Sequence, residues 1–322
     1  MRYFLILNPG SKGGKSKKSF NKIFGAFNNA KINFDYKITQ TLNDAYAFSV
    51  EANKSGYDII VAVGGDGTIN NVLNGFFDSE GRRISNSKMG VIYTGTSPDF
   101  CKSYNIPIKT DEAISTLIEN KSIQIYIGKL LCSSENDISL NNSDIFKIDT
   151  PKLKYFACCA NIGLGATLAR KANSGIRKYL GDAIGTFISL ITTIATYKAN
   201  DFKIIQDGKE QILGKLFNLS IGRTKFIASG IQVLNNIKYD KKGFYLMKVR
   251  SLNLFNLPSL FKKVYSGKEF CNTSYLSLDY CNEIEILSNS KNPEIEMDGD
   301  PIGYLPCKIE ISNDKLELIV KQ

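Results

Sequence analysis

The segment VAVGGDGTINN, residues 61–71, decides the fold of this chain. An apolar run ends there in a turn made of Gly64, Gly65, Asp66, Gly67 and Thr68. The next residues, 68–77, carry apolar side chains at helical spacing. A buried strand that leads through a glycine turn into a helix is typical of α/β proteins, whose ligands bind beyond the carboxyl ends of the strands. The turn is therefore the first candidate for a ligand site.

Outward from this turn, strand-like and helix-like segments alternate through the first third of the chain. Apolar runs predict strands at 2–8, 32–39, 58–65 and 88–95, and helical spacing predicts helices at 18–30, 43–56, 68–77 and 111–120. Such alternation implies a parallel sheet covered by helices. From about residue 123 short strand-like runs follow one another, apart from a helical insert at 174–199. We therefore expect an α/β domain at 1–122 and a β-rich domain, a sandwich or an open barrel, at 123–305.

Composition narrows the classes of partner and site. The chain of 322 residues has 41 basic and 31 acidic side chains, a net charge of +10, which suits nucleic acid, a nucleotide or an anionic membrane. It has no histidine, and its seven cysteines form no CxxC pair, so no zinc site or disulfide framework is indicated. The first strand is too short for a signal peptide, and the longest apolar stretch, 183–197, is too short to span a membrane. We expect a cytoplasmic protein with reduced thiols.

Two standard phosphate-binding motifs are excluded by single residues. Gly14, Lys15 and Ser16 end like a P-loop, but that motif requires glycine where this chain has Pro9. The dinucleotide fingerprint would require a third glycine where this chain has Asn70. The basic, glycine-rich turn at 8–18 is still suited to phosphate at a helix N-terminus, with a flexible solvated turn as the alternative.

The carboxylate of Asp66 indicates what the glycine turn binds. A bare carboxylate would repel phosphate, with a cost on the order of 1 kcal/mol in water and more near a protein surface. A Mg²⁺ ion removes this conflict, because it binds both carboxylate and phosphate oxygens. Residues 64–68 therefore suggest a site for a Mg²⁺–nucleotide complex and for phosphoryl transfer. The alternative is a tight turn in which Asp66 only caps the helix.

Five segments spread over 300 residues resemble the diacylglycerol kinase catalytic-domain superfamily, in particular its soluble bacterial members, which are related to sphingosine and ceramide kinases. They are NPGSKGGK at 8–15, Thr39 ahead of Asp44 and Ala45, GGDGTINNVLNG at 64–75, GTSPDF at 95–100 and EMDGDPIG at 296–303. The order and spacing are more specific than GGDGT alone, since NAD kinases and phosphofructokinases carry similar loops.

The resemblance implies a fold and an activity. The fold would be an α/β domain like that of NAD kinase and phosphofructokinase, completed by residues 306–322, and a β-sandwich-like lipid-binding domain, with the active site in the cleft between them. The activity would be transfer of the γ-phosphoryl group of ATP, with Mg²⁺, to a lipid hydroxyl in phospholipid biosynthesis. Diacylglycerol, giving phosphatidic acid, is the first expected acceptor, and monoacylglycerol, ceramide-like and undecaprenol-like lipids stay open.

The expected site residues follow from the matched segments. With no histidine in the chain, the base that accepts the hydroxyl proton is a carboxylate, a lysine or a phosphate oxygen. We expect Asp298 as the base, with Asp300 as a second catalytic residue. The expected Mg²⁺ ligands are Asp66, Asp99 and Asp300, and the nucleotide would contact Asn8, Thr39, Gly64, Gly65, Asp66, Gly67, Thr68 and Thr96. The alternative for Asp298 is an ordinary Asp-Gly β-turn.

Two residues depart from the family pattern. Pro98 stands where the family usually has asparagine, so a side-chain amide is lost ahead of Asp99. Asp300 stands where the family has glutamate, which keeps the charge but shortens the side chain by one methylene. These two changes keep a non-catalytic nucleotide or lipid sensor open as an alternative to a lipid kinase. A kinase of a soluble substrate, in the manner of NAD kinase, is the other alternative.

Expectations about partners rest on charge and on the insert. The segment at 174–199 has basic ends and an apolar middle, so it would lie at a membrane interface, wall an acyl pocket or simply pack on the β domain. The positive net charge suits peripheral binding to an anionic membrane. We expect no nucleic-acid partner, since no recognisable module is present. Whether two copies form a homodimer is left open.

Overall fold

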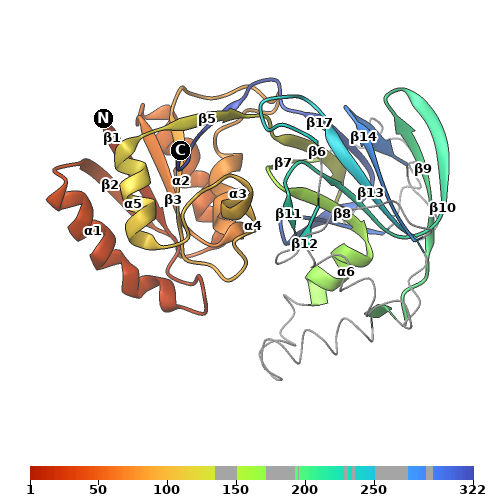
Figure 1. The fold of residues 1–322 in the computed structure, drawn as a ribbon, viewed down its shortest axis with the longest axis horizontal. Helices are drawn as coiled ribbons and strands as arrows, with labels where there is room; N and C mark the ends of the chain where they lie inside the picture. The colour runs from red at the N-terminus through yellow and green to blue at the C-terminus, as the bar shows by residue number, and fades with distance from the viewer. Residues whose placement is uncertain are drawn as a thin grey trace.

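The computed structural model describes residues 1–134, 151–171, 193–194, 196–227, 231–233, 236–250, 275–287 and 293–322. The expected insert at 174–199 lies mostly outside these residues. The chain folds into two parts, an N-terminal α/β part and a C-terminal part rich in strands (Figure 1). The coarse prediction of a parallel-sheet domain followed by a strand-rich domain is thus confirmed.

The first part is built on a six-stranded sheet in the order β2, β1, β3, β4, β18, β5. All neighbours are parallel except β5, which runs antiparallel to β18. The strands are β1 (Arg2–Leu7), β2 (Asn33–Ile38), β3 (Ile59–Gly64), β4 (Lys88–Tyr93), β5 (Ser122–Ile125) and β18 (Leu316–Ile319). Parallel strands put their carboxyl ends at one edge, so the loops after β1, β3 and β4 meet there.

Helices cover both faces of this sheet, because strand side chains alternate in direction. Leu5 and Leu7 of β1 pack on one face, and Phe4 and Ile6 pack on the other. The first face is covered by α1 (Phe20–Asn29) and α5 (Thr110–Glu119), and the second by α2 (Leu42–Lys54) and α3 (Asp66–Asn74). A short η1 (Lys15–Ser19) and α4 (Asp99–Ser103) complete the helices of this part.

The second part is a large, mostly antiparallel sheet. Its strands are β6 (Gly128–Ser133), β7 (Lys152–Phe156), β8 (Cys159–Gly163), β9 (Asn200–Gln206), β10 (Lys209–Gly222), β13 (Phe244–Arg250), β14 (Leu276–Cys281), β15 (Ile284–Ile286), β16 (Glu294–Met297) and β17 (Asp300–Ile311). The α6 helix (Leu164–Lys171) follows β8, and β11 (Phe226–Ile227) pairs only with β12 (Ile231–Gln232).

Pairing closes six of these strands into a ring, in the order β10, β8, β16, β17, β15, β9 and back to β10. Closure is achieved because the long β10 pairs with β9 along its first half and with β8 along its second half. Of the two expected forms, a sandwich and an open barrel, this pairing is nearer to the barrel. Buried side chains such as Phe156, Phe202 and Leu219 fill the core.

Strand pairing also places the borders between the two parts. The run at 123–131, expected as one β-domain segment, is split between β5 of the first sheet and β6 of the second. At the other end β17 stays in the second sheet as far as Ile311, and only β18 returns to the first. The two crossing segments hold each other, since the Ser312 N–H donates to the Ile127 carbonyl at 2.9 Å. The borders thus differ by a few residues from 122 and 306.

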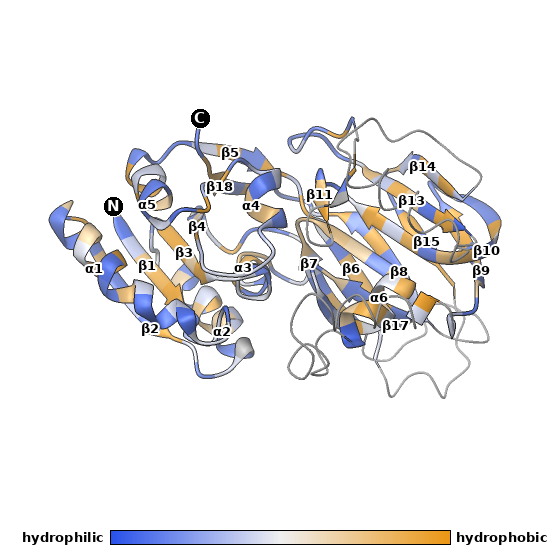
Figure 2. Cartoon of the chain, turned by 60° about the horizontal axis from the view of Figure 1, so that its bottom comes forward, coloured by the Kyte–Doolittle hydropathy of each residue, from blue (hydrophilic) through white to orange (hydrophobic). Residues whose placement is uncertain are grey.

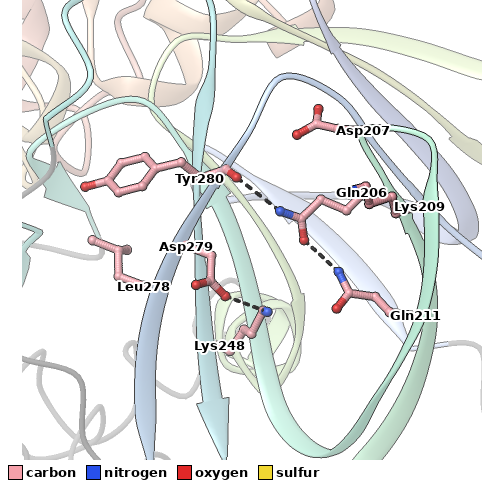
Figure 3. A pocket seen from close by; sticks show the side chains of 8 residues that line it. All are labelled: Gln206, Asp207, Lys209, Gln211, Lys248, Leu278, Asp279 and Tyr280. Carbon is pink, nitrogen blue, oxygen red and sulfur yellow. Dashed lines mark hydrogen bonds and ion pairs between the residues drawn. The ribbon is translucent and has the colours of Figure 1, made fainter.

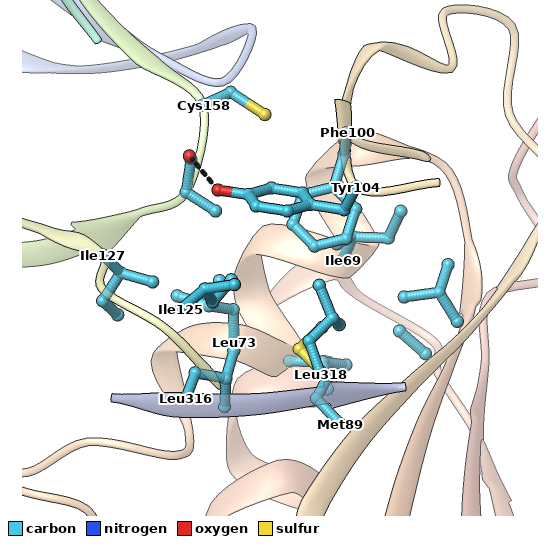
Figure 4. Close-up of a cluster of buried hydrophobic side chains, with 14 of the residues drawn as sticks. Ile69, Leu73, Met89, Phe100, Tyr104, Ile125, Ile127, Cys158, Leu316 and Leu318 are labelled. Atoms are coloured by element: carbon cyan, nitrogen blue, oxygen red, sulfur yellow. Dashed lines mark hydrogen bonds between the residues drawn. The ribbon is translucent and has the colours of Figure 1, made fainter. Parts of the chain in front are cut away.

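An apolar core runs without interruption from the first part into the second. Ile69 and Leu73 of α3, Tyr104, and Ile125 and Ile127 of the crossing segment belong to the same buried cluster (Figure 4). The Tyr104 hydroxyl donates across the boundary to the Ala157 carbonyl at 2.9 Å. Figure 2 shows apolar residues concentrated on the strands of both sheets. The two parts are therefore packed directly against each other.

The cysteines in the described ranges are all buried and free: Cys101, Cys132, Cys158, Cys159, Cys281 and Cys307. Within those ranges no helix is long and apolar enough to cross a membrane.

Candidate active site

The turn after β3 forms a tight junction between strand and helix. The α3 helix begins at Asp66, with Gly65 in an extended conformation before it. A Cβ atom on Gly64 would come within 2.4 Å of Thr68 Oγ1, so only glycine lets the first helical turn lie this close to the strand. The first turn of a helix leaves N–H groups without helical partners. These groups and the helix dipole favour an anion at this edge of the sheet.

Hydrogen bonds tie the loops after β1 and β4 to this turn. Asn8 Nδ2 donates to Thr68 Oγ1 at 2.8 Å, which joins the end of β1 to α3. Ser11 Oγ donates to the Thr94 carbonyl at 3.0 Å, and the Ser16 and Thr94 hydroxyls are 2.9 Å apart. Three segments far apart in the sequence, 8–16, 64–68 and 94–99, therefore lie together on one side of the site.

Asp66 lies where the second and third of these loops meet. Tyr93 Oη donates to Asp66 Oδ2 at 3.2 Å, and the Ser97 N–H in turn donates to the Tyr93 hydroxyl. Burial first, and then the neighbouring Asp99 carboxylate, raise the pKa of Asp66 to about 7, although the Tyr93 hydrogen bond lowers it. The charged form of Asp66 is thus disfavoured until a cation arrives.

Asp298 reaches the same place from the second part of the molecule. Met297 at the end of β16 pairs with Asp300 at the start of β17, so Asp298 and Gly299 are the two central residues of a hairpin turn, with φ of 49° and 97°. Positive φ at both positions is the geometry that an Asp-Gly hairpin requires. The alternative interpretation of Asp298 as an Asp-Gly turn is therefore correct as a description of the backbone, and it does not conflict with a role for the side chain.

The Asp298 carboxylate is held by backbone and side-chain donors. Its Oδ1 accepts the Cys159 N–H at 2.9 Å and the Cys158 N–H at 3.2 Å. Its Oδ2 accepts Asn70 Nδ2 at 2.8 Å and the Ala157 N–H at 3.3 Å. Burial raises the pKa of Asp298 to about 6, whereas these donors lower it by favouring the charged form.

Two asparagines of α3 make the connection between the two parts. Asn74 binds the main chain of Tyr155 twice: its Nδ2 donates to the carbonyl and its Oδ1 accepts the N–H, both at 2.8 Å. Asn74 Nδ2 also donates to Asn70 Oδ1 at 3.0 Å, which turns the Asn70 amide so that its Nδ2 faces Asp298. The helix that carries Asp66 thereby fixes the position of Asp298.

Asp300 and Glu296 extend the acidic cluster. A Cβ atom on Gly67 would lie 3.1 Å from Asp300 Oδ2, so Asp300 reaches the first turn of α3. Burial raises the pKa of Asp300, and the Lys154 ammonium lowers it. Glu296 accepts Asn161 Nδ2 at 2.7 Å and the Gly299 N–H at 2.5 Å, and burial raises the pKa of Glu296 to about 7.

The structure brings most of the predicted site residues together. Asn8, Gly64, Gly65, Asp66, Gly67, Thr68, Asp99, Asp298 and Asp300 surround the first turn of α3. Thr39 lies at the same sheet edge, but its side chain is buried and its hydroxyl donates to the Leu7 carbonyl at 3.4 Å. Thr96 lies in an exposed part of the loop after β4. The roles assigned to these residues remain predictions.

Sequence reasoning missed Asn70, Asn74, Tyr93, Asn161 and Glu296. From the sequence, Asn70 stands out only as the residue that excludes the dinucleotide fingerprint, and Asn74 only as part of the predicted helix at 68–77, although their spacing of four residues puts both on one helix face. Nothing in the sequence shows that this face meets a strand of the second part. Tyr93 lies inside the strand predicted at 88–95, and a strand pattern does not show which group its hydroxyl contacts.

A separate hollow of about 510 Å³ lies in the second part, between the β9–β10 hairpin and the strands β13 and β14 (Figure 3). Two of its charged groups are paired with each other, since Lys248 Nζ lies 2.6 Å from Asp279 Oδ2. Gln211 Nε2 donates to Gln206 Oε1 at 2.8 Å. Its lining contains none of the acidic residues around α3.

Comparison with known proteins agrees with this geometry. Residues 2–130 match the family model of the diacylglycerol kinase catalytic domain. The chain is 25% identical over 304 residues to a diacylglycerol kinase of Staphylococcus aureus (strain bovine RF122 / ET3-1), covering 94% of this chain and 87% of that protein. It is 24% identical over 303 residues to the diacylglycerol kinase of Staphylococcus carnosus (strain TM300), covering 94% and 90%.

The fold is also shared with a solved structure. A crystal structure of a diacylglycerol kinase from Bacillus anthracis str. Sterne superposes with a TM-score of 0.68 at 18% identity, covering 99% of this chain and 97% of that one. The match by family and by fold includes the glycine turn and the loops that meet it. Residues 2–130 thus match a diacylglycerol kinase catalytic domain, and the chain as a whole is similar in sequence and in fold to proteins named as diacylglycerol kinases.

Proposed function

We propose that this protein transfers the γ-phosphoryl group of ATP, with Mg²⁺, to the hydroxyl of diacylglycerol, giving phosphatidic acid. The observation that carries the proposal is the 2.8 Å hydrogen bond from Asn70 to Asp298. It brings a carboxylate of the second part to the helix that begins with Asp66, so a base and a phosphate-binding turn face one site. The names of the relatives support a lipid as the acceptor.

The nucleotide phosphates fit the edge where the three loops meet. The N–H groups of the first turn of α3 would bind them, together with the open turn of the first loop, where Gly13 and Gly14 have φ of 63° and 86°. A Cβ atom on either of these two glycines would have nothing within 4 Å, so the turn has room above it. Lys12 and Lys15 on the same loop add positive charge.

The acidic residues fit a Mg²⁺ ion that is bound only in part by the protein. In the described part of the chain no group of three or more acidic or cysteine side chains is arranged to hold a metal alone. This suits Mg²⁺, which usually binds one or two carboxylates and takes its other ligands from phosphates and water. Asp66 and Asp300 would hold the ion, with Asp99 acting through water. When bound, the ion neutralises charge on the phosphates during transfer.

Asp298 would act as the base. In this step the lipid O–H proton passes to a carboxylate oxygen of Asp298, the lipid oxygen forms a bond to the γ-phosphorus, and the bond from that phosphorus to the leaving oxygen of ADP breaks. Two of the four donors to Asp298 are long, at 3.2 and 3.3 Å, so a lipid hydroxyl could replace one of them. A pKa of about 6 suits a base near neutral pH.

A lipid acceptor brings the protein to a membrane surface. The net charge of +10 supports peripheral contact with anionic lipid from the cytoplasmic side. No described residue identifies the acyl chains that the second part would accept. The insert at 174–199 is the segment that the sequence offers for this role.

The test is phosphoryl transfer from labelled ATP to a panel of acceptors. Purified protein is incubated with Mg²⁺ and with dispersed diacylglycerol, monoacylglycerol, ceramide, undecaprenol, NAD and simple sugars, with and without EDTA. We expect label in the diacylglycerol product only, and only without EDTA. Label in NAD or a sugar would point to a soluble-substrate kinase. Binding of ATP without any labelled product would point to a sensor.

A further inference from the structure

We propose that Tyr93 is a positioning residue of the phosphoryl-transfer site, whose hydroxyl holds the Asp66 carboxylate in the orientation that a Mg²⁺–nucleotide complex requires. The inference rests on the proposed function, because it assigns Asp66 to the bound Mg²⁺.

The Tyr93 hydroxyl has a defined direction. Tyr93 is the last residue of β4, and only 5% of its surface is exposed, so its ring is fixed by packing. The Ser97 N–H donates to the hydroxyl oxygen, and the hydroxyl itself donates to Asp66 Oδ2 at 3.2 Å. A phenol has one proton to donate. Because the oxygen already accepts from Ser97, the proton is directed to Asp66.

Two glycines allow this approach. A Cβ atom on Gly95 would lie 2.6 Å from Tyr93 Oη and 2.7 Å from Gly65 Cα, so a larger residue would collide with both. A Cβ atom on Gly65 would lie 3.2 Å from Gly95 Cα. The loops after β3 and β4 are thus in direct contact: the Thr94 N–H donates to the Gly64 carbonyl at 2.8 Å, and the Tyr93 hydroxyl adds a side-chain link to Asp66.

Asp66 depends on such a link more than most carboxylates. Within the described ranges it makes no ion pair with a lysine or arginine, and Tyr93 is the side chain that donates to it. The Asp99 and Asp298 carboxylates lie near enough to repel it. Without the hydroxyl, Asp66 would turn away from these charges, and the ion would have to reorient it on binding.

The experiment compares Tyr93→Phe with wild type in nucleotide binding by calorimetry. The substitution removes one oxygen and keeps the ring, and thermal unfolding checks that both proteins are folded. We expect the affinity for MgATP to fall about 10-fold, the usual effect of losing a hydrogen bond to a charged group, while the affinity for ATP in EDTA changes less than about 2-fold. The Mg²⁺ concentration for half-maximal turnover should rise by a similar factor.

Tyr57→Phe is the matched control. Tyr57 donates to Asp35 Oδ2 at 2.7 Å, a bond of the same kind in the same domain, and neither residue is placed in the site. This variant should bind MgATP as wild type does. Equal loss of affinity for MgATP and for ATP in EDTA in Tyr93→Phe would overturn the inference, because it would show a general effect on the loops. An unchanged Mg²⁺ requirement would overturn it as well.

A double-mutant cycle with Asp66→Asn tests whether Tyr93 acts through Asp66. If it does, Tyr93→Phe lowers MgATP affinity much less in the Asp66→Asn protein than in wild type. Equal losses in both backgrounds would overturn the inference. If the wild type transfers no phosphoryl group but Tyr93→Phe still loses affinity for MgATP selectively, the proposed function alone is refuted. If the wild type is active but Tyr93→Phe shows no such loss, the role of Tyr93 alone is refuted.

Discussion

Two Asp-Gly pairs, Asp66-Gly67 and Asp298-Gly299, lie in the same site but in opposite surroundings. Asp66 begins a helix after a parallel strand, and Asp298 occupies a hairpin turn between antiparallel strands. The Asp66 carboxylate accepts from the Tyr93 hydroxyl and faces neighbouring carboxylates. The Asp298 carboxylate accepts from Asn70 and from three backbone N–H groups.

This difference shows that the groups around each carboxylate, and not the Asp-Gly dipeptide, set the role of the aspartate. A carboxylate among other carboxylates needs an added cation, which fits Asp66 as a ligand for Mg²⁺. A carboxylate surrounded by N–H donors is fixed in place and can stay charged without a metal, which fits Asp298 as a base. Substitutions of Asp298 and Asp66 separate these two roles, and a substitution of Asn70 removes the contact that links them.

The largest effect is expected at Asp298. Asp298→Asn should lower turnover by roughly 10² to 10⁴, the usual contribution of general-base catalysis, and should leave MgATP affinity nearly intact. Binding by calorimetry and transfer to diacylglycerol are measured on one preparation at saturating Mg²⁺. If MgATP affinity falls together with the rate, Asp298 is a ligand of the metal, and its role does not differ from that of Asp66.

Asp66 should show the opposite pattern. Asp66→Asn should weaken MgATP binding by about 10- to 100-fold, as expected for losing a charged ligand of the ion, with little change in the melting temperature. Titration of Mg²⁺ at fixed ATP measures the shift. Wild-type binding and turnover in this variant would return Asp66 to the role of a helix cap.

Asn70 tests the link between the two carboxylates. Asn70→Ala removes a donor to Asp298 at 2.8 Å and should lower turnover about 10-fold while MgATP affinity changes little. Asn71→Ala is its neighbour control, because among the described residues Asn71 Nδ2 donates within the helix, to the Gly67 carbonyl at 2.8 Å. Equal losses in both variants would mean that a disturbed helix, and not a misplaced base, causes the effect.

Glu296 should affect stability rather than turnover, through a pH dependence. Burial raises the pKa of Glu296 in the folded protein from 4.5 to about 7, so the folded state binds the proton more tightly than the unfolded state. The contribution of Glu296 to the free energy of unfolding is therefore fully present below pH 4.5 and is lost as the pH rises through about 7. The loss is at most about 1.4 kcal/mol per pH unit.

Glu296→Gln provides the check for this pH dependence. Denaturant unfolding without Mg²⁺, at several pH values between 5 and 7.5, should give a shallower loss of unfolding free energy in the variant than in wild type. Glu285→Gln is the control, since Glu285 lies on the barrel surface beside Lys308. Parallel curves for wild type and Glu296→Gln would mean that Glu296 titrates as in the unfolded chain.

Much of the first part could be predicted because its signals are local. The strands and helices around the glycine turn follow from the apolar spacing, and Asp66 and Asp99 lie in the loops after two of these strands, whereas Asp298 and Asp300 were assigned to the site only through the family resemblance. The second part was harder. Its short strands were visible, but the closed ring depends on β10 pairing with a different strand along each half, which no local pattern encodes.

The sequence by itself determined the glycine turn with its carboxylate, the sheet that carries it and the acidic hairpin turn, because strand period, glycine conformation and charge are properties of neighbouring residues. Only the tertiary structure decided that Asn70 faces Asp298 and that the Tyr93 hydroxyl faces Asp66. These contacts join residues 228 and 27 positions apart. They depend on how two packed parts and two loops meet, which short-range patterns do not specify.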